Sequence, residues 1–180
     1  MKFIRYLVLA LVVTSLFSLS AYSQKKTTSK RTKASSTKST AAALPPLDVR
    51  AARVKVENQQ VNITEFLKRL GPVAQAIEAL DAEAATTKLK KESLDKNAAD
   101  KQAVIAAIRN VREGLVKLES EFRVKAVLKK YLPTIQGISE LAGQAETSAI
   151  AGKFVAANVP LRSVQQKLTD TLAAMPAAQL

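Results

Sequence analysis

The chain has 180 residues, about the length of one domain, and 28 Lys+Arg against 15 Asp+Glu give it a formal net charge of +13. It contains no His, no Cys and no Trp. The absence of these residue types excludes disulfides, thiolate or imidazole metal sites, haem ligated by His or Cys, and Ser-His or Cys-His nucleophile pairs. We therefore expect neither a metal nor a cofactor, and we expect that the protein is not an enzyme.

The first 23 residues have the pattern of a secretory signal peptide. Lys2 and Arg5 form a positive start, residues 6–17 are uncharged and mostly apolar, and small residues precede Gln24. The alternative is an uncleaved membrane anchor, but a spanning helix needs ~20 apolar residues and this run is shorter. We predict cleavage at Ser23-Gln24 and a secreted or periplasmic protein, without a choice between periplasm and open medium.

Residues 24–46 form a basic linker that we expect to be disordered. Residues 24–43 include six Lys or Arg and nine Ser or Thr, with no acidic and no aromatic residue, so they cannot bury enough apolar surface to fold. The candidate contacts to a polyanion are Lys25, Lys26, Lys30, Arg31, Lys33 and Lys38.

Three kinds of partner fit this linker: an anionic polymer, an anionic membrane surface or an envelope protein. Clustered Lys and Arg are attracted to anionic polymers and to anionic lipid surfaces alike. Without aromatic residues to stack on bases, sequence-specific nucleic-acid recognition is not expected. The alternative is a soluble spacer whose charge only keeps the domain dispersed.

From Val49 onward, apolar residues recur at alternating intervals of three and four, which is typical of amphipathic helices in bundles and coiled coils. The same spacing continues through residues 54–63, whose alternation would otherwise suggest strands. Asp48 is the predicted N-cap of this helix. Pro72 predicts a kink, and the alternative is a fresh helix start at Asn62.

Residues 86–97 lose the apolar spacing and are predicted to be a polar connection, with Asn97 capping the next helix. That helix extends to Phe122, with Glu119 and Arg123 expected as an ion pair on its solvated face. A short turn or two should follow up to Tyr131.

A third helix is predicted from Pro133 to about Ile150, with Gly152 as its C-terminal stop. A last helix should be kinked at Pro160, and the residues predicted to line it are Phe154, Ala157, Leu161, Val164, Leu168 and Met175. Short connections between amphipathic helices favour antiparallel neighbours, so we predict an all-α, up-down-up-down four-helix bundle over residues 47–176. Many of its residues are alanine, and a homodimer would bury more surface than such a thin core does alone.

The carboxylates give little sign of acid–base chemistry. Glu78 with Asp81, and Glu92 with Asp95, can each share a helix face, but they lie among Lys, Thr and Ala and are interpreted as surface charge. The basic clusters of the body are interpreted in the same way; they are Lys88, Lys90, Lys91, Lys96, Lys129 and Lys130. The four aromatic residues of the body are interpreted as core, with an interhelical pocket as the alternative; they are Phe66, Phe122, Tyr131 and Phe154.

These observations predict an exported, non-enzymatic helical-bundle protein with an interaction or structural role in the cell envelope or extracellular space, its cationic tail contacting anionic surfaces. The alternative is a small-ligand-binding or enzymatic bundle that uses Lys and carboxylate groups in an interhelical pocket. A deeply buried Lys or Glu with a strongly shifted pKa would favour the alternative.

Overall fold

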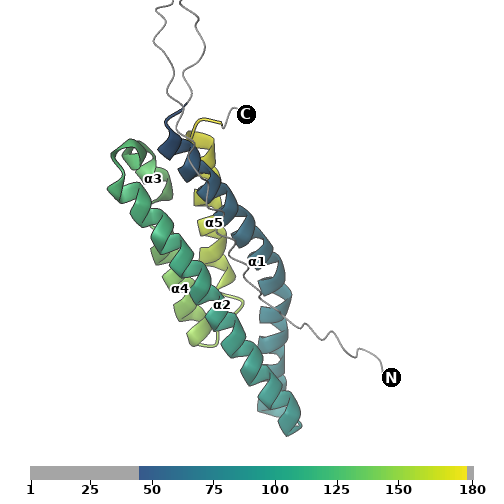
Figure 1. Cartoon of the computed structure of the whole chain (residues 1–180). Helices are drawn as coiled ribbons and strands as arrows, with labels where there is room; N and C mark the ends of the chain where they lie inside the picture. Colours follow the sequence, from purple (N-terminus) through teal and green to yellow (C-terminus); the bar gives the residue numbers. More distant parts are fainter. Residues whose placement is uncertain (1–44, 178–180) are drawn as a thin grey trace, which may run out of the picture. The chain divides into compact units, whose positions relative to one another are not determined.

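The computed structural model describes residues 45–177, and these residues are almost entirely helical (Figure 1). The helices are α1 (Leu47–Thr86), α2 (Lys91–Val124), the 3-10 helix η1 (Ala126–Tyr131), α3 (Leu132–Ile135), α4 (Ile138–Ile150) and α5 (Asn158–Ala174). Within this part of the chain there is no strand, so the predicted all-helical class is confirmed and the strand alternative for residues 54–63 is wrong. The predicted signal peptide and nearly all of the predicted linker lie outside the described residues.

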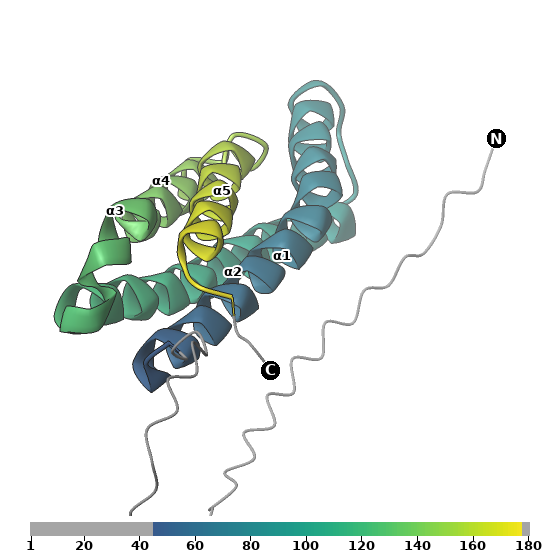
Figure 2. The same cartoon turned by 90° about the horizontal axis from the view of Figure 1, so that it is seen from above.

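Helix α1 follows the predicted apolar spacing from Val49 to Ile77, except that Ala74 is buried in place of Val73, and no residue of the helix after Ile77 is buried. Its buried residues are Val49, Ala52, Val56, Ile63, Leu70, Ala74 and Ile77. The helix runs without interruption through Asn62 and Pro72, so the fresh start at Asn62 is wrong. Figures 1 and 2 show α1 bending in its second half, the half in which Pro72 removes a backbone donor. The predicted cap is also wrong, because Pro46 precedes the helix and the Asp48 carboxylate binds Lys125 instead.

The connection between α1 and α2 is shorter than predicted. Only residues 87–90 separate the two helices, so Asn97 lies inside α2 and does not cap it. Asn97 is buried, and its Nδ2 donates a hydrogen bond of 2.7 Å to Asp81 Oδ1 on α1. A side chain that resembled a helix cap in the sequence therefore joins two helices.

The predicted third helix is split in two. Helix α3 ends at Ile135 and α4 begins at Ile138, because Gly137 adopts a left-handed conformation with φ of 89°. Gly152, with φ of 75°, follows α4, as the sequence predicts for its C-terminal stop. Pro160 lies in the first turn of α5, where its missing N–H group needs no helical partner, so the expected kink there is wrong.

One hydrophobic core joins the helices. Helix α2 packs mainly against α4, and α1 packs mainly against α5. Contacts between α4 and α5 and between α1 and α2 join these two pairs to each other. The core interpretation of Phe122, Tyr131 and Phe154 is confirmed, because all three are buried in this core, and Phe66 packs against it. The end of α1 and the start of α2 extend beyond α4 and α5 as a helical hairpin (Figure 1). None of the described helices is long and apolar enough to cross a membrane.

Candidate functional site

Two carboxylates, Glu119 and Glu146, are buried among the described residues, with only 2% and 7% of their surface exposed. Glu119 lies on α2 and Glu146 lies on α4, and each is paired with at least one arginine. The expectation that Glu119 lies on a solvated face is therefore wrong. A buried carboxylate is the residue type from which acid–base chemistry would be built, so the partners of both groups decide what they can do.

Glu119 binds the start of α4. Its Oε1 accepts a hydrogen bond of 3.0 Å from the Gly137 N–H, and its Oε2 accepts from the Ser139 N–H at 3.0 Å and the Ser139 hydroxyl at 2.6 Å. The Arg123 guanidinium also donates to Oε1. Because the first N–H groups of a helix have no partners within it, this carboxylate acts as an N-cap supplied by another helix.

These contacts keep Glu119 ionised. Burial raises the pKa of Glu119, but the N–H of Gly137, both donors of Ser139 and the charge of Arg123 together lower it below its ordinary value. A general acid at neutral pH needs a raised pKa, so Glu119 has the opposite tuning. Its arrangement suits a structural anion that fixes the beginning of α4.

Glu146 joins α4 to α2 through two arginines. Its Oε1 accepts from Arg109 Nε and its Oε2 from Arg112 Nη1, each at 2.9 Å. These two hydrogen bonds lower the pKa of Glu146 and outweigh the effect of its burial. Both guanidinium groups are about half exposed, so the pair is buried on the carboxylate side only.

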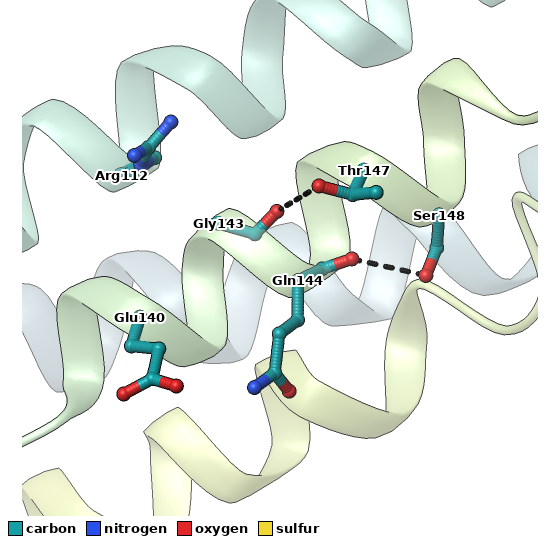
Figure 3. Close-up of a pocket in the computed structure, with 6 residues that line it drawn as sticks. All are labelled: Arg112, Glu140, Gly143, Gln144, Thr147 and Ser148. Atoms are coloured by element: carbon teal, nitrogen blue, oxygen red, sulfur yellow. Dashed lines mark hydrogen bonds between the residues drawn. The ribbon is translucent and has the colours of Figure 1, made fainter.

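An open surface depression lies beside Arg112, between α2 and α4 (Figure 3). Its lining residues are Arg112, Glu140, Gly143, Gln144, Thr147 and Ser148. The two hydroxyls donate to the backbone of their own helix, Thr147 to the Gly143 carbonyl at 2.9 Å and Ser148 to the Gln144 carbonyl at 3.0 Å. Neither hydroxyl is therefore paired with a base that would activate it as a nucleophile.

A third group of charges connects the beginning of α1 to the end of α2. Glu121 accepts from Lys55 at 2.6 Å and is paired with Lys125 at 2.8 Å, and Lys125 also donates to Asp48 at 2.8 Å. The hydrogen bonds to Asp48 and Glu121 raise the pKa of Lys125. Burial raises the pKa of Glu121, but its two lysine partners lower it more.

Two further side chains bind the ends of α5. Arg53 Nη1 donates to the carbonyl oxygens of Leu172 at 2.7 Å and Met175 at 2.9 Å, at the C-terminus of the helix. Glu78 Oε1 accepts from the Val155 N–H at 2.8 Å, in the turn before the helix. Sequence reasoning missed these contacts because the bonded residues are 77 to 122 positions apart.

The basic clusters that were predicted from the sequence lie away from the buried carboxylates or outside the described residues. Lys25, Lys26, Lys30, Arg31, Lys33 and Lys38 lie outside the described residues. The predicted surface position of the other basic clusters is confirmed, because Lys88, Lys90, Lys91, Lys96, Lys129 and Lys130 are all exposed. Among residues 45–177, no cluster of three or more acidic side chains suitable for a metal ion is present.

Comparison of the chain with models of known families, with curated proteins and with solved structures finds no match.

Proposed function

We propose that the chain is an exported, non-enzymatic helical protein with an interaction or structural role in the cell envelope or extracellular space, and that its cationic tail contacts anionic surfaces. The observation that carries this proposal is the use of the buried carboxylates. Glu119 holds the start of α4, and Glu146 holds α4 to α2. Both have lowered pKa values, which suits ionised structural groups and not proton donors.

We also propose that α1, α2, α4 and α5 form an antiparallel up-down-up-down four-helix bundle. Arg53, near the start of α1, binds the end of α5, whereas Glu78, late in α1, binds the turn before α5. Asp48 and Asp81 contact the end and the first half of α2, respectively. Because the chain has no cysteine, pairs of spin labels can be introduced at chosen sites. Labels at positions 47 and 124 should lie close together and labels at positions 47 and 94 far apart, and the reverse would contradict this topology.

The alternative function, ligand binding or catalysis in an interhelical pocket, has weaker support. The depressions beside Arg112 are open to solvent, and their arginines are already bound to Glu146. Thr147 and Ser148 donate to their own helix. A small acidic ligand at Arg112 would have to compete with an existing ion pair.

The proposal is tested by comparing residues 24–180 with residues 44–180 in binding to anionic vesicles and to polyphosphate across a salt series. We expect that removal of the tail lowers both the affinity and the slope of log affinity against log salt, because counterion release scales with the number of basic contacts. Equal binding by the two versions would make the tail a spacer. Export is tested separately by fractionation of cells that express the full chain and by mass spectrometry of its N-terminus. A chain retained in the cell with residues 1–23 attached would contradict the predicted leader.

A further inference from the structure

One end of the described helical domain carries large exposed apolar side chains next to lysines. Leu47 is the first residue of α1 and Val124 is the last residue of α2, and their surfaces are 75% and 77% exposed. Val127 on η1 is also exposed. Lys129 and Lys130 follow on η1. We call these five residues the η1-end surface.

The fold brings these residues to one end, although α1 and η1 are far apart in the sequence. Figures 1 and 2 both show the start of α1 beside the region where α2 ends, and α1 contacts η1 directly. The ion pair between Asp48 and Lys125 fixes this approach. Leu47 and Val124 are the residues immediately before these two partners, so their side chains belong to the same end of the domain.

The charge of this surface is positive. No acidic residue occurs from Arg123 to Tyr131. Arg123 and Lys125 are engaged by Glu119, Glu121 and Asp48, whereas Lys129 and Lys130 have no carboxylate within ion-pair distance among residues 45–177. These two lysines are therefore available to an external anion.

The basic linker joins the domain at this end. Residue 44, which immediately precedes the described part, lies only three positions before Leu47. The six Lys and Arg of the linker, at positions 25–38, are therefore tethered by the chain to the end of the domain where α1 begins. A membrane bound by the linker would therefore be held near the end of the domain that carries the η1-end surface.

We propose that the η1-end surface docks onto an anionic lipid membrane, with Leu47 and Val124 entering the headgroup layer and Lys129 and Lys130 facing the lipid phosphates. This inference rests on the proposed function for the charge of the tail, and it adds the folded surface that the tail would bring to the membrane. Apolar side chains next to lysines suit a lipid interface, because burying apolar surface and neutralising anionic headgroups both favour binding. A soluble polyanion would use the lysines but would gain little from Leu47 or Val124.

The tip of the α1–α2 hairpin is the closest rival and provides a matched control. It carries Lys88, Lys90 and Lys91, but Lys91 is paired with Asp95, and Glu92 follows directly. Its exposed apolar residue, Leu94, has 41% of its surface exposed, about half the value of Leu47 or Val124. The basic linker does not enter at this tip.

Binding is measured with residues 24–180 on phosphatidylcholine vesicles with and without phosphatidylglycerol. Because the chain has no tryptophan, Val124→Trp introduces a single fluorescent probe at the η1-end surface, and Val159→Trp, at an exposed position at the start of α5, is its control. We expect the emission of the Val124→Trp variant to shift to shorter wavelength on anionic vesicles only, and that of the Val159→Trp variant to stay unchanged. A shift of both probes or of neither would overturn the proposal.

Charge and apolar contacts are then separated. Lys129→Gln with Lys130→Gln should weaken vesicle binding about 25-fold, at about fivefold for each lysine near the surface, whereas Lys88→Gln with Lys90→Gln should not weaken it. Leu47→Ser with Val124→Ser should weaken vesicle binding but leave polyphosphate binding unchanged, whereas Ile150→Ser with Val159→Ser, at similarly exposed positions, should alter neither. Circular dichroism confirms that each variant is folded.

The outcomes distinguish this inference from the proposed function. If removal of the tail weakens binding but the η1-end variants bind like their controls, the surface does not dock and the role of the tail stands. If the chain binds polyphosphate but not anionic vesicles, its partner is a soluble polyanion and the lipid proposal is wrong. If residues 24–180 bind neither probe at any salt concentration, the proposed function of the tail fails together with this inference.

Discussion

Glu119 provides the sharpest test of how the fold is held together. The Glu119→Ala variant removes the acceptor for the N–H groups of Gly137 and Ser139 and for the Ser139 hydroxyl. Leaving a buried polar group without a partner costs about 1–3 kcal/mol. The Arg123 side chain is 58% exposed, so water can replace its lost partner and it adds little to this cost. Because three donors lose their acceptor together, we expect the free energy of unfolding to fall by about 3–5 kcal/mol.

The assay is urea unfolding followed by circular dichroism at neutral pH, with Glu113→Ala as the control. Glu113 lies on the same helix, is exposed and carries the same charge, so its replacement should change stability by less than about 0.5 kcal/mol. Glu119→Gln keeps the shape but places an amide N–H₂ group among donors, and we expect a loss smaller than that of Glu119→Ala. A loss below about 1 kcal/mol for Glu119→Ala, or one equal to that of the Glu113→Ala control, would refute the capping role.

The remaining predictions concern other helix ends and the acid response. Arg53→Ala should destabilise the protein by about 2–3 kcal/mol in urea unfolding because two carbonyl oxygens at the end of α5 lose a charged donor, and Arg53→Lys should recover part of this loss. Gly137→Ala should cost about 1–2 kcal/mol because a Cβ opposes its left-handed φ of 89°. Gly143→Ala in α4 should instead gain about 0.5–1 kcal/mol, since its Cβ would meet Arg112 at ordinary contact distance; equal effects of the two glycine substitutions would contradict this reasoning. The pKa values of Glu119 and Glu146 are lowered in the folded state, so their contribution to stability is full above the unfolded pKa of about 4.3 and is lost as pH falls through the folded pKa. Acid unfolding of the Glu119→Gln variant should therefore show a shallower loss of stability below about pH 5 than that of the unsubstituted chain.

Local rules explain which sequence predictions succeeded. The spacing of apolar residues from Val49 to Ile77 predicted the buried face of α1, because a helix repeats every 3.6 residues whatever it packs against. Gly152 was predicted as the stop after α4 because only a residue without a Cβ adopts its left-handed conformation freely. Such features depend only on a few neighbouring residues, so they can be predicted directly from the sequence.

Predictions of helix ends failed where a distant residue decided the outcome. Asp48 and Asn97 are both residue types that cap helices, yet each binds another helix. In all six helices no side chain caps its own N-terminus, and Glu119 from α2 binds the start of α4. Nothing in the neighbourhood of Glu119 distinguishes it from the exposed Glu113, because its burial depends on a turn that lies 18 residues further along the chain.

The sequence by itself therefore determined the helical class, the apolar face of each long helix and the residue types available for chemistry, since each of these follows from composition or from a local period. The tertiary structure alone decided which charged side chains are buried, which helix ends they bind, and that the start of α1, at Asp48, meets the end of α2. Those outcomes depend on the approach of segments far apart in the chain, and an isolated carboxylate or leucine carries no local mark of the neighbour it will acquire.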